Sequence, residues 1–146
     1  MPLAFSVRPA RWPEDESAIS RVRRTVFIEE QGVPEALEWE DWDQDCAWFV
    51  AEAAESAVVG IGRLTPVGRI GRMAVLPAWR RRGVGTALLG AVLAEARARG
   101  QRRVELSAQS QAVPFYAGLG FAALGDEYLD AGIPHRTMTL ELGAGE

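Results

Sequence analysis

The segment from Ile70 to Gly85 constrains the fold of this chain more than any other part of the sequence. Its apolar first half, up to Leu76, predicts a buried strand, and Arg80-Arg81-Arg82-Gly83-Val84-Gly85 then leads into a helical pattern. A helix start offers unpaired N–H groups and a partial positive charge, glycines let a ligand approach the backbone, and arginines add charge. A strand, a basic glycine-bearing turn and a helix N-terminus together predict a binding site for a phosphorylated ligand.

The elements around this unit predict one α/β domain over residues 1–146. We expect helices at 17–31, 83–99 and 112–119 and strands at 5–8, 47–53, 57–64, 69–76, 103–108, 121–124 and 137–142. The strands before and after the helix at 83–99 should run parallel, and most other connections should be hairpins. Residues 126–134 are expected to form a loop. The predicted fold is a mixed sheet of about six to seven strands flanked by helices.

The composition argues against several other classes of protein. Apolar residues make up 48% of the chain and charged residues 25%, as in ordinary globular domains. No apolar run approaches the roughly 20 residues that span a membrane, and the N-terminus lacks a signal-peptide pattern. The single cysteine, Cys46, cannot form an internal disulfide. We therefore expect a cytoplasmic protein with no membrane partner and no metal site.

Acidic and basic residues fall in different parts of the chain. Ten acidic residues and no basic one lie between Glu29 and Glu55, whereas ten arginines and one acidic residue lie between Arg63 and Arg103. A basic patch can bind nucleic acid. However, these arginines surround the predicted phosphate turn, and the net charge of the chain is −4. We therefore expect no nucleic-acid partner.

The phosphate turn fits neither of two common nucleotide loops, because it has no P-loop lysine and Gly83-Val84-Gly85 is followed by Leu88 instead of a third glycine. It fits the pattern Arg/Gln-x-x-Gly-x-Gly/Ala, and a second motif, Phe115-Tyr116-Ala117-Gly118-Leu119-Gly120-Phe121, lies about 30 residues downstream. Together the two motifs resemble the GNAT superfamily of acyl-CoA-dependent N-acetyltransferases, in the order of elements over residues 5–142. The resemblance extends to its ElaA-like branch through the segments 26–33, 107–109 and 132–135.

The resemblance implies acetyl-CoA, or a close acyl-CoA, as co-substrate. In the family the pantetheine arm pairs with the strand backbone, here Met73, Ala74 and Val75. The diphosphate would then lie on the turn formed by Arg80, Arg81, Arg82, Gly83, Val84, Gly85 and Thr86. The residues agree with this reading, since a diphosphate needs convergent N–H groups and a close backbone. An ordinary helix start with solvated arginines remains the alternative.

Transfer of an acetyl group to an amine needs a base for the amine, a donor for the oxyanion and a proton for the leaving thiolate. By resemblance, the backbone N–H of Ala74 or Val75, near a local bulge, serves the oxyanion, and Tyr116 protonates the thiolate. His135 is the candidate base, because its unperturbed pKa suits the task. A purely structural role stays open for Tyr116 and for His135. The other candidate bases are Glu30, Glu127 and Asp130.

The acceptor side is expected in the acidic segment, residues 35–45, which carries Trp39 and Trp42. Carboxylates beside tryptophan faces suit a cation, and Glu30 and Gln31 are further acceptor-binding candidates. A solvated acidic loop is the alternative. The predicted acceptor is the primary amine of a small molecule; a non-catalytic acyl-CoA-binding module and a protein or peptide N-acetyltransferase are the competing functions. A homodimer is possible on the family resemblance alone.

Overall fold

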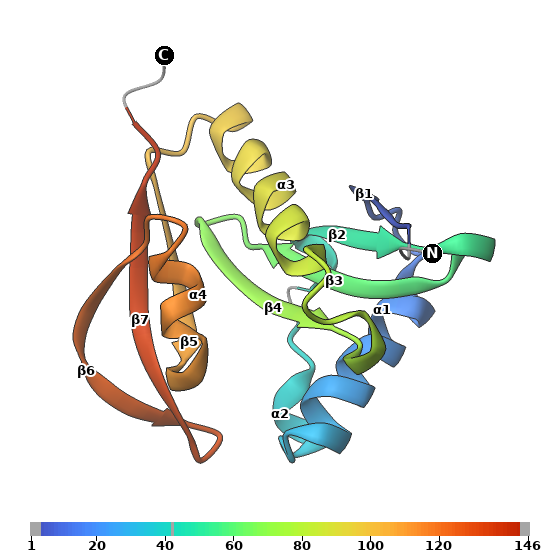
Figure 1. Ribbon diagram of the computed structural model, residues 1–146, viewed down its shortest axis with the longest axis horizontal. Coiled ribbons are helices and arrows are strands. Elements are labelled where there is room, and N and C mark those ends of the chain that lie inside the picture. The colour runs from blue at the N-terminus through green and yellow to red at the C-terminus, as the bar shows by residue number, and fades with distance from the viewer. Residues whose placement is uncertain (1–3, 42, 144–146) are drawn as a thin grey trace.

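The computed structural model describes residues 4–41 and 43–143. Within these residues seven strands form one sheet in the order β1-β2-β3-β4-β5-β7-β6 (Figure 1). The strands are β1 Ser6–Pro9, β2 Ala47–Glu52, β3 Val58–Leu64, β4 Arg69–Val75, β5 Arg103–Gln109, β6 Ala122–Asp130 and β7 Ile133–Glu141. β4 and β5 are parallel and the other neighbouring pairs are antiparallel. The predicted mixed sheet is confirmed.

The helices lie close to where the hydrophobic pattern predicts them. They are α1 Glu16–Arg23, α2 Glu35–Glu38, α3 Val84–Ala98 and α4 Val113–Ala117, with a π-helix, η1, at Arg24–Glu30. Short 3₁₀ turns occur at η2 Asp43–Asp45, η3 Ala54–Ser56, η4 Pro77–Trp79 and η5 Ser110–Ala112. The expected helix at 17–31 is therefore present, but its second half is wound more widely than an α-helix. Such π-turns are frequent at functional sites.

Helices cover both faces of the sheet. On one face Val84, Leu88 and Val92 of α3 pack into a buried core with apolar residues of β2 to β5. On the other face Ile19 and Val22 of α1 pack with apolar residues of β2, β3 and β4. Neighbouring residues of a strand point to opposite faces, so β4 contributes Ala74 to the second core and Met73 and Val75 to the first.

The two parallel strands stay together for only a short distance. β4 pairs with β5 at Arg69–Glu105 and Ile70–Leu106, and the strands then separate (Figure 1). A β-bulge lies at the point of separation, because the register between β3 and β4 shifts between Ile61 and Arg63. The sheet is thus divided into a β1–β4 half and a β5–β7–β6 half, and the rest of β4 presents backbone to the space between them.

The prediction of a loop at 126–134 is wrong. β6 runs to Asp130 and β7 begins at Ile133, so this segment is a hairpin with a tight turn at Ala131-Gly132. β6 is an edge strand with almost every residue exposed, so it lacks the apolar alternation that marks a half-buried strand. A register shift between Leu124 and Tyr128 takes up the turn-like residues 125–127 as an irregularity within the strand.

Candidate functional site

A cleft of about 970 Å³ opens where β4 and β5 separate. Its walls are formed by η1, β4, the start of α3, the end of β5, α4 and the β6–β7 turn. Most residues predicted for the site line it: Glu30, Gln31, Met73, Ala74, Val75, Arg80, Gly85, Tyr116 and His135. Segments from four separate parts of the chain are thereby brought to one space.

The backbone of β4 presents Val75 to this cleft. Ile61 pairs with Ala74, and the Leu76 N–H donates to the Val59 carbonyl over 2.9 Å. Hydrogen-bonding directions alternate along an antiparallel ladder, so the polar groups of Ala74 face β3 and those of Val75 point away from β3. Arg80 Nε accordingly donates to the Val75 carbonyl over 2.9 Å. Of the two amides considered for an oxyanion, Val75 is the one directed at the cleft.

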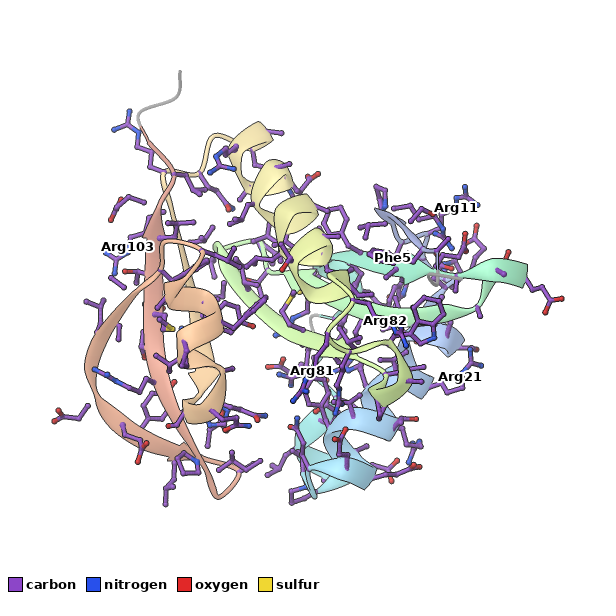
Figure 2. All side chains as sticks on the ribbon, in the orientation of Figure 1. Phe5, Arg11, Arg21, Arg81, Arg82 and Arg103 are labelled. Atoms are coloured by element: carbon purple, nitrogen blue, oxygen red, sulfur yellow. The ribbon has the colours of Figure 1, made fainter. Side chains whose placement is uncertain are left out.

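The turn before α3 has the geometry of a helix start whose backbone a ligand can approach closely. Gly83 has a φ of 84° and Arg81 a φ of 62°, both in the left-handed region. The first intrahelical bond runs from the Ala87 N–H to the Gly83 carbonyl, at 3.0 Å. The N–H groups of residues 84–86 therefore belong to the first turn, where they have no partner within the helix. The side chains of Arg81 and Arg82 lie beside this turn (Figure 2).

The two sequence motifs meet at this point. An added Cβ at Gly85 would lie 3.7 Å from Cζ of Phe115, so α3 and α4 approach each other closely. Tyr116 is half-buried and packs edge-to-face against Phe115 and Phe121, with ring centroids 5.1 and 5.7 Å apart. Burial raises the pKa of Tyr116 to about 12. Among the described residues its hydroxyl has no hydrogen-bond partner, so it is a protonated phenol in the wall of the cleft.

His135 is buried on β7 and held in one orientation. Its Nδ1 lies 2.7 Å from the Ile133 carbonyl. A carbonyl can only accept, so in the neutral ring the proton lies on Nδ1 and Nε2 carries the lone pair. The ring stacks on Tyr128 with centroids 6.2 Å apart, and the Tyr128 hydroxyl is hydrogen-bonded to Ser107. Asp130, another candidate base, also lines the cleft, whereas Glu127 does not and bonds Ser110.

Glu30 and Gln31 connect opposite parts of the cleft wall. Glu30 forms a two-pronged ion pair with Arg80, at 2.6 and 2.7 Å, which joins the end of η1 to the turn before α3. The hydrogen bonds from Arg80 lower the pKa of Glu30. Gln31 accepts from Nε2 of Gln109 over 2.6 Å and so joins η1 to the end of β5. Both residues are in the cleft, and both already have partners.

The acidic segment is largely neutralised by arginine. Arg23 is 2% exposed and binds Glu38 over 2.8 Å and Asp43 over 2.9 Å. Arg63 is 5% exposed and binds Asp43 and Glu40. Burial raises the pKa of Asp43, but hydrogen bonds from the Glu40 N–H and from Arg23 outweigh burial and lower it. We call this set the buried charge network; its members are Arg23, Arg63, Arg72, Glu38, Glu40 and Asp43.

Trp39, one of the two predicted acceptor tryptophans, is not brought into the cleft with the other residues. Trp39 lines a second, smaller cleft of about 450 Å³, under the guanidinium groups of Arg23 and Arg24, 4.7 and 5.7 Å from the ring centroid. Trp42 lies outside the described residues. Conversely, Arg63 and Arg72 line the main cleft and were not among the predicted site residues. The sequence feature that could have identified them is an arginine within a mostly apolar strand.

Two further observations concern metal binding and membrane-spanning helices. Among residues 4–41 and 43–143, no group of three or more His, Cys, Asp or Glu side chains is arranged to hold a metal ion. None of the helices in this part of the chain is both long enough and apolar enough to cross a membrane.

Comparison with known proteins agrees with the geometry. Residues 14–142 match the family model for the acetyltransferase (GNAT) domain. The uncharacterized N-acetyltransferase YjcF of Bacillus subtilis is 38% identical over 121 residues, 80% of this chain and 86% of that protein. An acyl-CoA N-acyltransferase of Pseudomonas aeruginosa has a TM-score of 0.78 at 28% identity, over 94% of this chain and 99% of that one. Escherichia coli ElaA shares the fold, with a TM-score of 0.78 at 23% identity, over 93% and 99% of the two chains. This chain therefore belongs to the GNAT acetyltransferase family.

Proposed function

We propose that this protein transfers an acetyl group from acetyl-CoA to a primary amine of a small molecule by direct attack. The observation that carries the proposal is the cleft between β4 and β5. Unpaired strand backbone, a glycine-bearing helix start, a protonated phenol and an oriented imidazole all border this one space. Family membership supports an acyl-CoA donor, and the geometry supports the roles of the individual residues.

The donor fits the side of the cleft formed by β4 and α3. The pantetheine arm carries amides that can pair with a strand backbone, and β4 lacks a paired neighbour beyond Ile70 on its β5 side. The diphosphate would lie on the first-turn N–H groups of residues 84–86, with Arg81 and Arg82 beside it. Gly83 suits this turn because its left-handed φ is strained for a residue with a side chain, so glycine favours the turn that exposes these groups.

The amine would be deprotonated by His135. Its Nε2 carries the lone pair, and the hydrogen bond from Nδ1 to the Ile133 carbonyl keeps the ring from turning that lone pair away. As the amine attacks, the carbonyl oxygen becomes an oxyanion. The Val75 N–H is the backbone donor directed at the cleft, and one such donor contributes about 3 kcal/mol to a transition state of this kind.

Tyr116 would act on the leaving thiolate through a hydrogen bond. A phenol with a pKa of about 12 is protonated at neutral pH. Complete transfer of its proton to a thiolate of pKa near 8.5 is uphill by roughly 3.5 pKa units, or about 5 kcal/mol. The difference between the pKa of the phenol and that of the thiol is larger than the sequence alone suggested, because burial raises the pKa of Tyr116. Hydrogen-bond donation to the developing negative sulfur requires no such transfer and adds about 1.5–3 kcal/mol.

The acceptor end favours a small molecule over an extended peptide. The Gln31–Gln109 hydrogen bond joins η1 to β5, which disfavours a continuous open groove for a chain. Three carboxylates of the acidic segment, those of Glu38, Glu40 and Asp43, are paired with arginines in the buried charge network, so these three attract a cationic substrate only weakly. Asp130, which lines the cleft near His135, forms no ion pair with another described residue and is the remaining carboxylate for an amine substrate.

A thiol-release screen tests the function. The purified protein is incubated with acetyl-CoA and polyamines, amino acids, aminosugars or short peptides, and acetyl-CoA binding is measured separately by calorimetry. We expect binding, together with amine-dependent release of free CoA for a small amine. Turnover on peptides alone would favour a protein N-acetyltransferase. Tight binding without turnover on any class would favour a non-catalytic acyl-CoA-binding module.

Tyr116→Phe tests the role of the phenol. The substitution removes one hydroxyl and keeps the ring that packs between Phe115 and Phe121. Loss of a hydrogen bond to a charged group costs about 1.5–3 kcal/mol, so kcat should fall roughly 10- to 100-fold. Acetyl-CoA affinity and thermal stability should stay near the wild-type values. Unchanged thiol release in this variant would remove Tyr116 from the mechanism.

His135→Asn tests the base. The asparagine amide can still donate to the Ile133 carbonyl, as Nδ1 does now, but it lacks the Nε2 lone pair. We expect kcat/KM for the amine to fall by about 10²–10⁴, the range for loss of a general base, with little change in acetyl-CoA affinity. Activity close to wild type would reassign the base, with Asp130→Asn as the next variant.

Glu30→Gln tests whether the ion pair competes with the donor. If Arg80 contacts the diphosphate, Glu30 must give up at least part of its hold on that guanidinium. An exposed pair of this kind contributes about 0.2–1 kcal/mol, so its removal should tighten CoA binding by up to roughly fivefold, measured by calorimetry. Glu105→Gln, which removes a similar pair with Arg69 away from the turn, is the matched control. Weaker binding by Glu30→Gln would show that the pair instead holds Arg80 in its binding position.

A further inference from the structure

Arg72 occupies a backbone conformation that disfavours arginine. It lies within β4 with a φ of 50°, at the bulge where the register with β3 shifts. Left-handed φ values in strands belong to bulges in which glycine is the usual residue, because a Cβ is crowded there. Non-glycine residues in such conformations are concentrated at functional sites. A side chain at this position therefore needs compensating contacts.

Arg72 contacts α2 through Glu38, and it also forms an ion pair with Glu40, just beyond α2, over 3.2 Å. Its Nη2 donates to the Glu38 carbonyl over 3.0 Å, and its Nε lies 2.9 Å from a Glu38 carboxylate oxygen. The second contact is an ion pair without the angle of a directed hydrogen bond. The Glu38 side chain is 4% exposed and also binds Arg23 of α1. Arg72 thus connects the bulge to α2 and, through Glu38, to α1.

The bulge determines where the cleft-facing backbone points. It lies three residues before Val75 and at the point where β4 leaves β5. A change in its dihedral angles would rotate the following residues relative to the cleft. We propose that Arg72 and Glu38 are positioning residues that hold the β4 bulge so that the Val75 N–H meets the thioester carbonyl. This inference rests on the proposed function, because it assigns a purpose to the bulge within that reaction.

Arg72 also lines the cleft, with a side chain that is 23% exposed, so direct contact with the acceptor is the competing explanation. The two explanations differ in which complex would respond to a substitution of Arg72. A positioning residue affects the thioester carbonyl in the complex with acetyl-CoA alone. A residue that contacts the acceptor affects only the complex that also contains the amine.

The experiment measures the carbonyl stretch of acetyl-CoA labelled with ¹³C at the thioester carbonyl, bound to the protein without an amine. Infrared difference spectra are compared for wild type, Arg72→Gly and Arg72→Lys. Glycine tolerates the left-handed φ, so it removes the side chain without new backbone strain. Lysine keeps the charge but cannot reproduce the guanidinium contacts, and it protects the test if the glycine variant does not fold. Arg69→Gln, an arginine of the same strand paired to Glu105, is the matched control.

We expect the bound carbonyl band of Arg72→Gly to move to higher frequency, because a hydrogen bond to the carbonyl is weakened. With an amine found in the screen, its kcat should fall about 10- to 100-fold, as expected for a misplaced reacting group. Acetyl-CoA affinity should stay within twofold, and Arg72→Lys should lie between wild type and Arg72→Gly. Glu38→Gln should move the band in the same direction.

Other results would overturn the inference in distinguishable ways. An unshifted band and unchanged kcat, with only a lower melting temperature, would make Arg72 a structural residue. An unshifted band with a raised KM for the amine would make it an acceptor ligand. Failure of the wild-type protein to bind acetyl-CoA would instead overturn the proposed function itself, and that binding is measured before any variant is compared.

Discussion

The separation of β4 from β5 after two residue pairs is the constraint on which the rest of this structure depends. An interior strand normally has both of its backbone edges paired, and unpaired backbone groups away from water are costly. Here one edge of β4 faces a cleft in the middle of the sheet. The Val75 carbonyl is met by Arg80. The remaining edge is available to an amide-bearing ligand, which would complete the sheet.

Packing on both faces fixes the helices around β3 and β4, next to the cleft. On the α3 face, an added Cβ at Gly60 would lie 2.9 Å from Val84, so a glycine lets α3 sit close against β3. This places the start of α3, and the turn before it, beside the end of β4. On the opposite face the buried charge network ties α1 and α2 to β3 and β4. The cleft is therefore bounded on one face by apolar packing and on the other by paired charges.

The strand, the turn and the helix proposed as the donor side were predicted closely from the sequence, because these elements are local. A strand, a turn and a helix within one segment need only their own periodicity and glycines to be recognised, and α3 begins at Val84 as the pattern implies. The acceptor side depends on contacts between distant segments, which periodicity does not encode. In the sequence, Glu38 and Asp43 look like solvated carboxylates. In the structure both are buried and form ion pairs with Arg23 or Arg63. Only the start of β6 was predicted, as a strand at 121–124, because the exposed second half of this edge strand has no apolar alternation.

The same neutralisation changes what the acidic segment can do for the reaction. A run of free carboxylates beside tryptophans would attract any cation, which makes for strong but unselective capture of amines. Once paired with arginines, those carboxylates act mainly by fixing α2 and the β4 bulge, and their net charge is balanced. In the proposed reaction, selection among amines would then depend on the shape of the space between η1 and the β6–β7 turn, and on the geometry around His135 and Asp130. In this protein the charge-rich segment would thus contribute to catalysis by positioning the backbone more than by attracting the substrate.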